Sequence, residues 1–474
     1  MPMTRTRLMS NAVANLTNGA ATAAFQLGMT AVMARAGSAR DLAVWSLAAS
    51  LSGLAPLLGC NLSMGVARRL AAARQGSETV GNAAEVMAAA TGLARRMTLL
   101  GAGAALLLGA AVPLLYPKFT SEKPLASALM VAAYFAGSCW MIAAQPVQGW
   151  LLDARSNWAI VGATAVSRAT ALVAAAGLLL AGAPAWSLAA AAGMLLWIAV
   201  PLMARQTGPQ AGQHVHAGTL HKEHKLLLRV SLGFAAWGAS SAVIQGASVP
   251  LVAWLMPAAA TPFFLAFTLV TVIIGAMMAA ANALVSPVAA MLARAERAAA
   301  ARLARRASAV VWLMANLALA AVYLALPQVL ALWTGARGPS ADIEAAAVRP
   351  YFALLALQHG IRSAGIVPSI VLAAGAVPRT LLRAVLPESS VAVLLALPLG
   401  FMMGPTGFLT ALAAAAAAGT LAASAFAASG PLKSGQDASK HDNADCRVAL
   451  MPTVAGLSLA SVILWTAAAW SGWR

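Results

Sequence analysis

Residues 42–67 read LAVWSLAASLSGLAPLLGCNLSMGVA, and no charged residue interrupts them. A helix needs about 20 predominantly apolar residues to cross the hydrocarbon core of a bilayer, so this stretch is typical of a transmembrane helix. Comparable stretches recur along the chain, separated by polar or by Pro- and Gly-containing breaks. We predict twelve spans and a thirteenth at the C-terminus, at residues 9–33, 42–67, 97–116, 125–150, 157–182, 184–203, 230–255, 262–292, 308–333, 350–373, 380–402, 405–428 and 448–470.

The composition also indicates a polytopic membrane protein. Of the 474 residues, 61% are hydrophobic and only 9% are charged, and the mean hydropathy is +0.80. Soluble domains carry about 25% charged residues, so these values exclude a soluble enzyme, a disordered tail and a secreted disulfide scaffold. The three cysteines, Cys60, Cys139 and Cys446, form no spaced pair that would indicate a disulfide or a metal site.

The spans are expected to be helices, because backbone groups in lipid must be satisfied within their own segment and the alternating pattern of a membrane barrel is absent. The net charge is +18, and most Lys and Arg residues fall in short segments on the same side as the N-terminus. The positive-inside rule then places the N-terminus in the cytoplasm. Basic residues in such loops indicate contact with membrane lipids, and we expect no nucleic-acid partner.

The sequence repeats itself at an offset of about 222 residues, which places Ser10 on Ser231, Asn61 on Asn282 and Pro146 on Pro368. Each half would hold six spans, so both halves start on the same side of the membrane and form a parallel pseudo-two-fold repeat. The predicted parts are a first bundle at 1–204, a cytoplasmic linker at 205–229, a second bundle at 230–428, and a polar loop with an additional span at 429–474.

Three stretches resemble a known family. Residues 41–76 (DLAVWSLAASLSGLAPLLGCNLSMGVARRLAAARQG), 146–160 (PVQGWLLDARSNWAI) and 371–385 (VLAAGAVPRTLLRAV) are similar to segments of the O-antigen and polysaccharide flippases of the multidrug/oligosaccharidyl-lipid/polysaccharide (MOP) exporter superfamily. The resemblance implies translocation of an undecaprenyl-pyrophosphate-linked oligosaccharide across the bacterial inner membrane during lipopolysaccharide or exopolysaccharide synthesis. It implies an anionic lipid-linked saccharide as cargo, and other polysaccharide-assembly proteins as partners. The thirteenth span departs from the family's usual even number.

Two arginines lie inside predicted spans. An arginine near the bilayer centre costs about 3 kcal/mol or more, so it normally faces protein, water or a ligand. Arg168 and Arg362 could line a cationic cleft that binds a pyrophosphate, and His359 shares a helix face with Arg362 and could extend that cleft. The alternative is that both arginines make structural contacts, and that His359 makes a polar contact between helices.

Glu388 is the carboxylate that falls clearly inside a predicted span. It is a candidate site for coupling transport to protons or sodium. The alternative is a countercharge for Arg168, since the repeat offset places Glu388 two residues from that position. Four histidines, His214, His216, His221 and His224, are more simply explained as a solvated linker than as a metal site.

The sequence therefore predicts a transporter and not an enzyme. No nucleotide-binding G-x-x-x-x-G-K-[ST] motif is present, and we expect no cofactor and no metal. The leading hypothesis is a flippase for a lipid-linked anionic saccharide that works by alternating access. One alternative is a cation-coupled multidrug exporter of the same superfamily, although the first and seventh predicted spans lack carboxylates. A membrane glycan polymerase or ligase is the other, and the outer loop at 334–349 offers few residues for catalysis.

Overall fold

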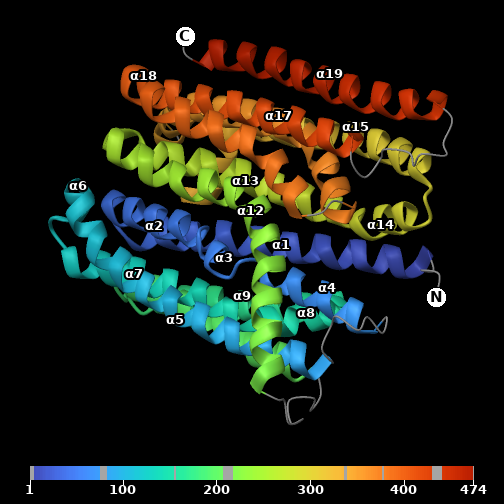
Figure 1. Cartoon of the computed structure of the whole chain (residues 1–474). Helices are drawn as coiled ribbons and strands as arrows, with labels where there is room; N and C mark the ends of the chain where they lie inside the picture. Colours follow the sequence, from blue (N-terminus) through green and yellow to red (C-terminus); the bar gives the residue numbers. More distant parts are fainter. Residues whose placement is uncertain are drawn as a thin grey trace. The chain divides into compact units, whose positions relative to one another are not determined.

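The computed structural model describes residues 5–74, 83–153, 156–206, 217–335, 339–375, 378–429 and 440–472. Every regular element within these ranges is a helix (Figure 1). Ten helices of the described chain are long and apolar enough to cross a membrane. These observations confirm the predicted all-helical, multi-pass membrane protein.

The thirteen predicted spans correspond to ten such helices for two reasons. First, α18 (Pro378–Ser429) runs through both of the spans predicted at 380–402 and 405–428. Gly404, with a φ of 65°, marks the kink between them, because a left-handed residue inside a helix favours glycine. Second, the spans predicted at 9–33 and 230–255 lie in α1 (Arg5–Ala36) and α12 (Ala217–Leu255), which are not among the ten.

The chain divides into two compact units, and the first to be described comprises Ala24–Trp254. In this unit α7 packs against α2, α5 and α10, and α10 packs against α9. Small residues allow close approach, as between Gly137 on α7 and Gly193 on α10. Helix α1 is divided between the two units, and its residues 24–36 belong to this one. Besides this part of α1 and most of α12, the helices of the unit are α2 (Ala39–Ser52), α3 (Ala55–Leu58), α4 (Leu62–Arg74), α5 (Ala83–Leu115), α6 (Pro117–Thr120), α7 (Pro124–Trp140), α8 (Gln145–Asp153), α9 (Asn157–Leu180), α10 (Ala185–Leu195) and α11 (Ala199–Ala204).

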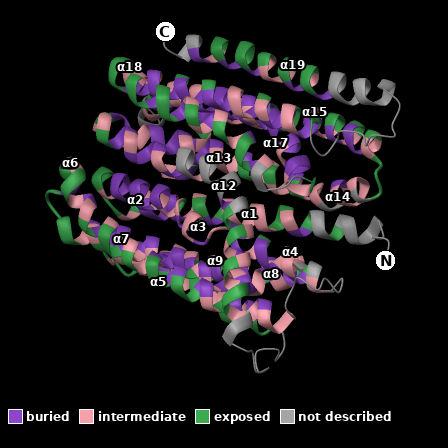
Figure 2. Cartoon of the chain, viewed as in Figure 1, coloured by how far each residue is buried: buried purple, intermediate pink, exposed green. Residues whose placement is uncertain are grey.

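The other unit comprises Met1–Ala23 and Leu255–Arg474. Its centre is α17 (Pro339–Gly375), which packs against α13, α15, α18 and α19. In the most apolar stretch of α17, 83% of the residues are buried, more than in any other candidate span (Figure 2). The remaining helices of this unit are α13 (Ala260–Asn282), α14 (Val285–Ala293), α15 (Arg297–Leu324), α16 (Leu326–Thr334) and α19 (Lys440–Gly472).

Corresponding spans of the two repeats are broken at corresponding places. The second predicted span is interrupted at Cys60 and Asn61, both with a φ of 49°, before α4 begins at Leu62. The eighth is interrupted after Asn282, and α14 begins at Val285. Since Asn61 and Asn282 are paired by the sequence offset, the break is a shared feature of the two halves.

The segment expected to be a polar linker, 205–229, is partly helical. Helix α12 begins within it, at Ala217. Two contacts explain why this polar segment continues the helix. Leu227 is fully buried, and Glu223 forms a buried ion pair with Arg69 of α4. Further along α12, the carbonyl of Gly246 accepts a hydrogen bond from Ser50 of α2, and that of Pro250 accepts one from Tyr116, between α5 and α6. Helix α12 is therefore fixed to the Ala24–Trp254 unit at both ends.

Candidate functional site

A buried polar cluster lies on α17, the most enclosed helix of its unit. Gln358, His359 and Arg362 occupy adjacent positions of one helical turn, and Gln358 and His359 are only 2% and 1% exposed. Residues three and four apart lie on one helix face, so the sequence spacing predicts that these side chains gather. Ser363, fully buried, donates a hydrogen bond to the carbonyl of Gly360 in the same turn.

Arg362 forms an ion pair with Glu388 of α18. Its Nη2 lies 3.1 Å from Oε1 of Glu388, and both side chains are largely buried. Glu388 packs tightly beneath Gly419, where an added Cβ would lie 2.9 Å from its Oε2. The structure thus gives Glu388 a different partner from the Arg168 considered from the repeat offset. A protein carboxylate offsets the cost of burying this guanidinium in an apolar unit.

Four polar atoms of this cluster are buried and lack a hydrogen-bond partner among the described residues. They are Gln358 Oε1, His359 Nδ1, Arg362 Nη1 and Glu388 Oε1. Buried polar groups are normally paired with protein or water, and each unpaired group costs about 1–3 kcal/mol. Glu388 Oε1 is nevertheless in ion-pair contact with Arg362 Nη2, so Gln358 Oε1 is the oxygen of the four without either kind of partner among the described residues. Such an oxygen is a suitable ligand for a water molecule or a hard cation. The cluster therefore has spare capacity to bind a small polar species.

A network of hydrogen bonds holds the extra helix α19 against this cluster. Trp465 of α19 donates through Nε1 to Asn316 Oδ1 of α15 at 2.9 Å, and Trp312 of α15 donates to Ser461 Oγ of α19 at 2.7 Å. Gly360 of α17 faces both α15 and α19, because an added Cβ there would lie 2.7 Å from Asn316 Oδ1 and 3.3 Å from Ser461 Oγ. Helix α19, which is the thirteenth predicted span, thus contacts α17 next to His359. Sequence reasoning missed Asn316, although a lone Asn in an apolar span is a signal of such a contact.

Arg168 lies in the other compact unit, on α9, and is only partly buried. It interacts electrostatically with the phenol of Tyr134 on α7. Tyr134 in turn makes an edge-on contact with Trp45 of α2, with ring centroids 4.7 Å apart. Of the four predicted site residues, the structure therefore brings Arg362, His359 and Glu388 together in one unit, and it places Arg168 in the other.

The second buried ion pair of the described chain was not predicted. Arg69 Nη2 lies 2.6 Å and 2.8 Å from the two carboxylate oxygens of Glu223, and the two side chains are 12% and 4% exposed. A charge-assisted contact of this length is among the stronger hydrogen bonds in proteins. Both residues stand in basic, polar segments whose composition suggests solvent exposure, so sequence alone gave no signal of the pair.

The histidine cluster of the linker is only partly described. His214 and His216 lie outside the described residues, and His221 is exposed. His224 lies beside Gly92 of α5, and its partial burial together with the positive charge of Arg96 lowers its pKa below the ordinary 6.5. Within the described part of the chain, no three His, Cys, Asp or Glu side chains gather as a metal site would require.

Comparison with known proteins gives similarity at the level of structure. No family model matches the chain, and no curated protein matches it in sequence. A eukaryotic MATE transporter superposes with a TM-score of 0.65 at 12% identity, over 94% of this chain and 98% of that one. An inward-facing multidrug resistance MATE family transporter of the MOP superfamily gives 0.64 at 13% identity, over 94% and 99%.

A third solved structure is a MOP superfamily transporter from Pyrococcus furiosus, for which a binding pocket of reverse polarity suggests a different function. It superposes with a TM-score of 0.58 at 14% identity, over 98% of this chain and 96% of that one. At these identities the comparisons establish the fold, which is that of MATE transporters with two six-helix halves. The three solved structures named here are all transporters.

Proposed function

We propose that this chain is a cation-coupled exporter that works by alternating access, and that Glu388 is its coupling site. The observation that carries the proposal is the buried Arg362–Glu388 pair in a chain with the MATE transporter fold. Gln358 Oε1 and His359 Nδ1, on the same helical turn as Arg362, are buried and have no hydrogen-bond partner among the described residues. The solved proteins of this fold include multidrug resistance transporters in inward-facing and outward-facing conformations. We further propose the bacterial cytoplasmic membrane as its location, with two transporting halves at 1–204 and 230–428.

The chemistry of the pair suggests how coupling would work. As a carboxylate, Glu388 pairs with Arg362; when it binds a proton or a sodium ion, its attraction for the guanidinium falls. The nearby Gln358 Oε1 could contribute to cation binding, since it is buried and without a hydrogen-bond partner among the described residues. Loading of Glu388 would thus loosen the contact between α17 and α18, the two helices that pack most extensively in their unit. A ligand can shift a conformational equilibrium only through such a difference between states.

A transport assay in proteoliposomes tests this proposal. The full-length protein would be reconstituted, and efflux of a fluorescent organic cation would be driven by an imposed proton or sodium gradient. We expect Glu388→Gln to lose the gradient-driven component, since the amide cannot exchange a proton or carry the charge that binds sodium. Glu344→Gln is the matched control, because Glu344 is a half-buried carboxylate of the same unit that is hydrogen bonded to Thr334. Gradient-driven efflux that survives in Glu388→Gln would refute Glu388 as the coupling site.

A second candidate cargo, the lipid-linked anionic saccharide, is favoured by different observations. Arg168 supplies a cation inside a predicted span of a chain whose net charge is +18. A binding pocket of reverse polarity has been described for the Pyrococcus furiosus transporter of the same fold. By contrast, Arg362 is neutralised by Glu388, which lessens its capacity to bind an anionic cargo. This candidate therefore rests on Arg168 rather than on the α17 cluster.

Flipping of a labelled lipid-linked oligosaccharide in proteoliposomes separates the two cargoes. If the saccharide is the cargo, Arg168→Ala should abolish flipping, because removal of the guanidinium leaves the phosphate without its charge-assisted contact. Arg383→Ala, at an exposed position on α18, serves as the control for loss of one arginine. Export of organic cations without any flipping would leave the exporter as the function.

A further inference from the structure

One four-residue sequence occurs twice, at related places in the two halves. Residues 93–96 and 303–306 both read LARR, and each is followed at the same distance by AAV, at 110–112 and 320–322. The offset here is about 210 residues, because the first half carries about a dozen more residues between its second and third spans. The two copies lie on α5 and α15, each the third long helix of its half.

In both copies the leucine and the alanine are at least partly buried, and the two arginines are exposed. Ala94 and Ala304 are buried, whereas both arginines of each copy are exposed. The exposed face of the same helix then becomes apolar within one turn. On α5 the exposed residues that continue the face are Leu99, Leu100, Leu106 and Leu107, and on α15 they are Val310, Leu313, Met314 and Leu317.

This sharp change locates a membrane boundary on each helix. Exposed leucines at 65–74% of their full area on α5 are compatible only with lipid or a partner of equal apolarity, since a water-exposed face of this size is unfavourable. Arginine side chains at the end of such a face extend to the headgroup layer. An arginine pair at the end of such a face is therefore within reach of lipid phosphates.

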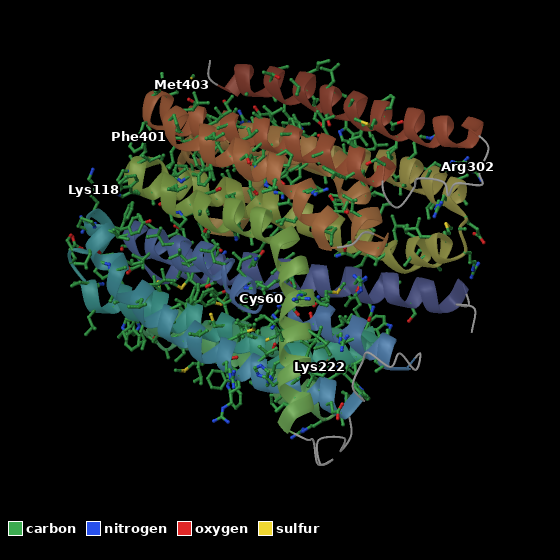
Figure 3. The ribbon with its side chains drawn as sticks, viewed as in Figure 1. Cys60, Lys118, Lys222, Arg302, Phe401 and Met403 are labelled. Carbon is green, nitrogen blue, oxygen red and sulfur yellow. The ribbon has the colours of Figure 1, made fainter. Side chains whose placement is uncertain are left out.

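Each pair has a further exposed basic residue in its own unit. Arg302 immediately precedes the second copy, about one turn before Arg305 and Arg306, and Lys222 of α12 is exposed in the unit of the first copy (both labelled in Figure 3). His224 of α12 lies within electrostatic range of Arg96. Among the ion pairs of the described chain, none involves an arginine of either LARR copy. Both sites are thus basic without a protein countercharge in the described residues.

We propose that the two LARR copies are binding sites for the phosphate headgroups of anionic phospholipids, with the acyl chains lying along the apolar face that follows each arginine pair. Guanidinium groups bind phosphate oxygens through paired hydrogen bonds. The charge complementarity and the continuous lipid-facing stripe together identify a bilayer phospholipid, since a free phosphate would leave the apolar face unused. The positive-inside rule places these sites in the cytoplasmic leaflet.

Native mass spectrometry of the full-length protein in detergent tests the proposal. Dioleoyl-phosphatidylglycerol would be titrated into wild type and into Arg95→Gln/Arg96→Gln and Arg305→Gln/Arg306→Gln. Each basic residue near an anionic lipid contributes about 1 kcal/mol, so each double variant should bind the lipid about 30-fold more weakly at its own site. Lys118→Gln/Lys123→Gln removes two exposed charges near α6, where Figure 3 labels Lys118, and should bind like wild type.

Three further measurements decide the result. The charge-conserving Arg95→Lys/Arg96→Lys variant should keep most of the binding, which shows that a loss in the glutamine variant is not a loss of folding. Dioleoyl-phosphatidylcholine should not compete, and inorganic phosphate at equal concentration should not displace the lipid. Equal binding by the glutamine variants and wild type, equal losses in the Lys118/Lys123 control, or displacement by inorganic phosphate would each overturn the proposal. Because none of these readouts measures transport, they stand apart from the test of the proposed function.

Discussion

The Arg362–Glu388 pair has a large effect on its surroundings because each charge depends on the other. Burying either charge alone in an apolar helical unit is costly, and the pair offsets that cost through one contact of 3.1 Å. Nη1 of Arg362 nevertheless makes no hydrogen bond within the described residues. The two charges of the pair therefore compensate each other, but the hydrogen-bonding capacity of the pair is not fully used. Such an arrangement suits a carboxylate that binds and releases a cation.

Removing one partner should destabilise the protein far more than removing both. Arg362→Gln leaves a buried, uncompensated carboxylate, and we expect it to cost about 3–5 kcal/mol. Arg362→Gln/Glu388→Gln replaces both charges with neutral amides, and it should recover most of that stability, because no uncompensated charge remains buried. Equilibrium unfolding of the purified protein in lipid–detergent mixtures measures both. A double variant that is stable but has no gradient-driven transport would separate the structural contribution of the pair from its role in coupling.

His224 should make the protein less stable in acid. Its pKa is lowered in the folded chain by partial burial and by Arg96, so the folded chain resists the proton that the unfolded chain accepts near the ordinary pKa of 6.5. Stability should thus be complete above that pH and should fall as the pH drops through it toward the lower folded value. We expect a smaller loss of melting temperature between about pH 7.5 and about pH 5.5 for His224→Gln than for wild type.

The control for that measurement is His221→Gln. His221 is exposed one turn earlier on the same helix, and it contributes less than burial or Arg96 to the lowered pKa of His224. It should therefore change the acid sensitivity little. If His221→Gln and His224→Gln behaved alike, the acid sensitivity would come from the general charge of the segment and not from the position of His224.

At the scale of helices, α19 is an integral part of its unit. Trp465 is 1% exposed and packs against Tyr323 and Phe352, with ring centroids 5.9 Å and 6.5 Å away. The hydrogen bonds to Asn316 and from Trp312 add direction to this apolar contact. A helix that packed on its neighbours through apolar contacts alone would have no such specific hydrogen bonds. Helix α19 therefore contributes to positioning α17.

Two serines one turn apart on α19 test this point. Ser461 is fully buried and accepts a hydrogen bond from Trp312, whereas Ser458 bonds only within its own helix. Ser461→Ala leaves the Trp312 N–H without its partner, and it should cost about 1–3 kcal/mol of unfolding free energy. Ser458→Ala should cost much less. Equal effects in the two variants would mean that the Trp312 bond contributes nothing specific.

Much of the helical organisation could be predicted from the sequence, because apolar stretches of membrane-spanning length are a local property. The pairing of Asn61 with Asn282 even marks the interruption that both repeats share. The choice of partners could not be predicted in this way. Arg362 and Glu388 are close only because α17 packs on α18, and Arg69 meets Glu223 across a long separation in sequence. Side-chain contacts between distant helices depend on how each helix is rotated about its own axis. The amino-acid composition of a span does not determine that orientation.

At the scale of the molecule, the repeat boundary and the compact units do not coincide. Residues 217–254 of α12 follow the first repeat in sequence, yet they belong to the Ala24–Trp254 unit. Ser50 donates a hydrogen bond to the Gly246 carbonyl at 2.9 Å, and Tyr116 donates to that of Pro250 at 3.1 Å. Together with the Glu223–Arg69 pair, these bonds join α12 to this unit, and we expect the helix to move with it.

A disulfide between α4 and α12 tests whether they stay together during transport. An added Cβ on Gly65 would lie 3.4 Å from the Cβ of Ser231, close to the separation that a disulfide requires. Gly65→Cys/Ser231→Cys, in a background with the three native cysteines replaced by serine, should crosslink spontaneously and should transport as fast oxidised as reduced. Failure to crosslink would contradict the packing of α12 on α4. A crosslinked protein that transports only after reduction would show that α12 must separate from α4 in each cycle. Helix α12 would then not move as a fixed part of the Ala24–Trp254 unit.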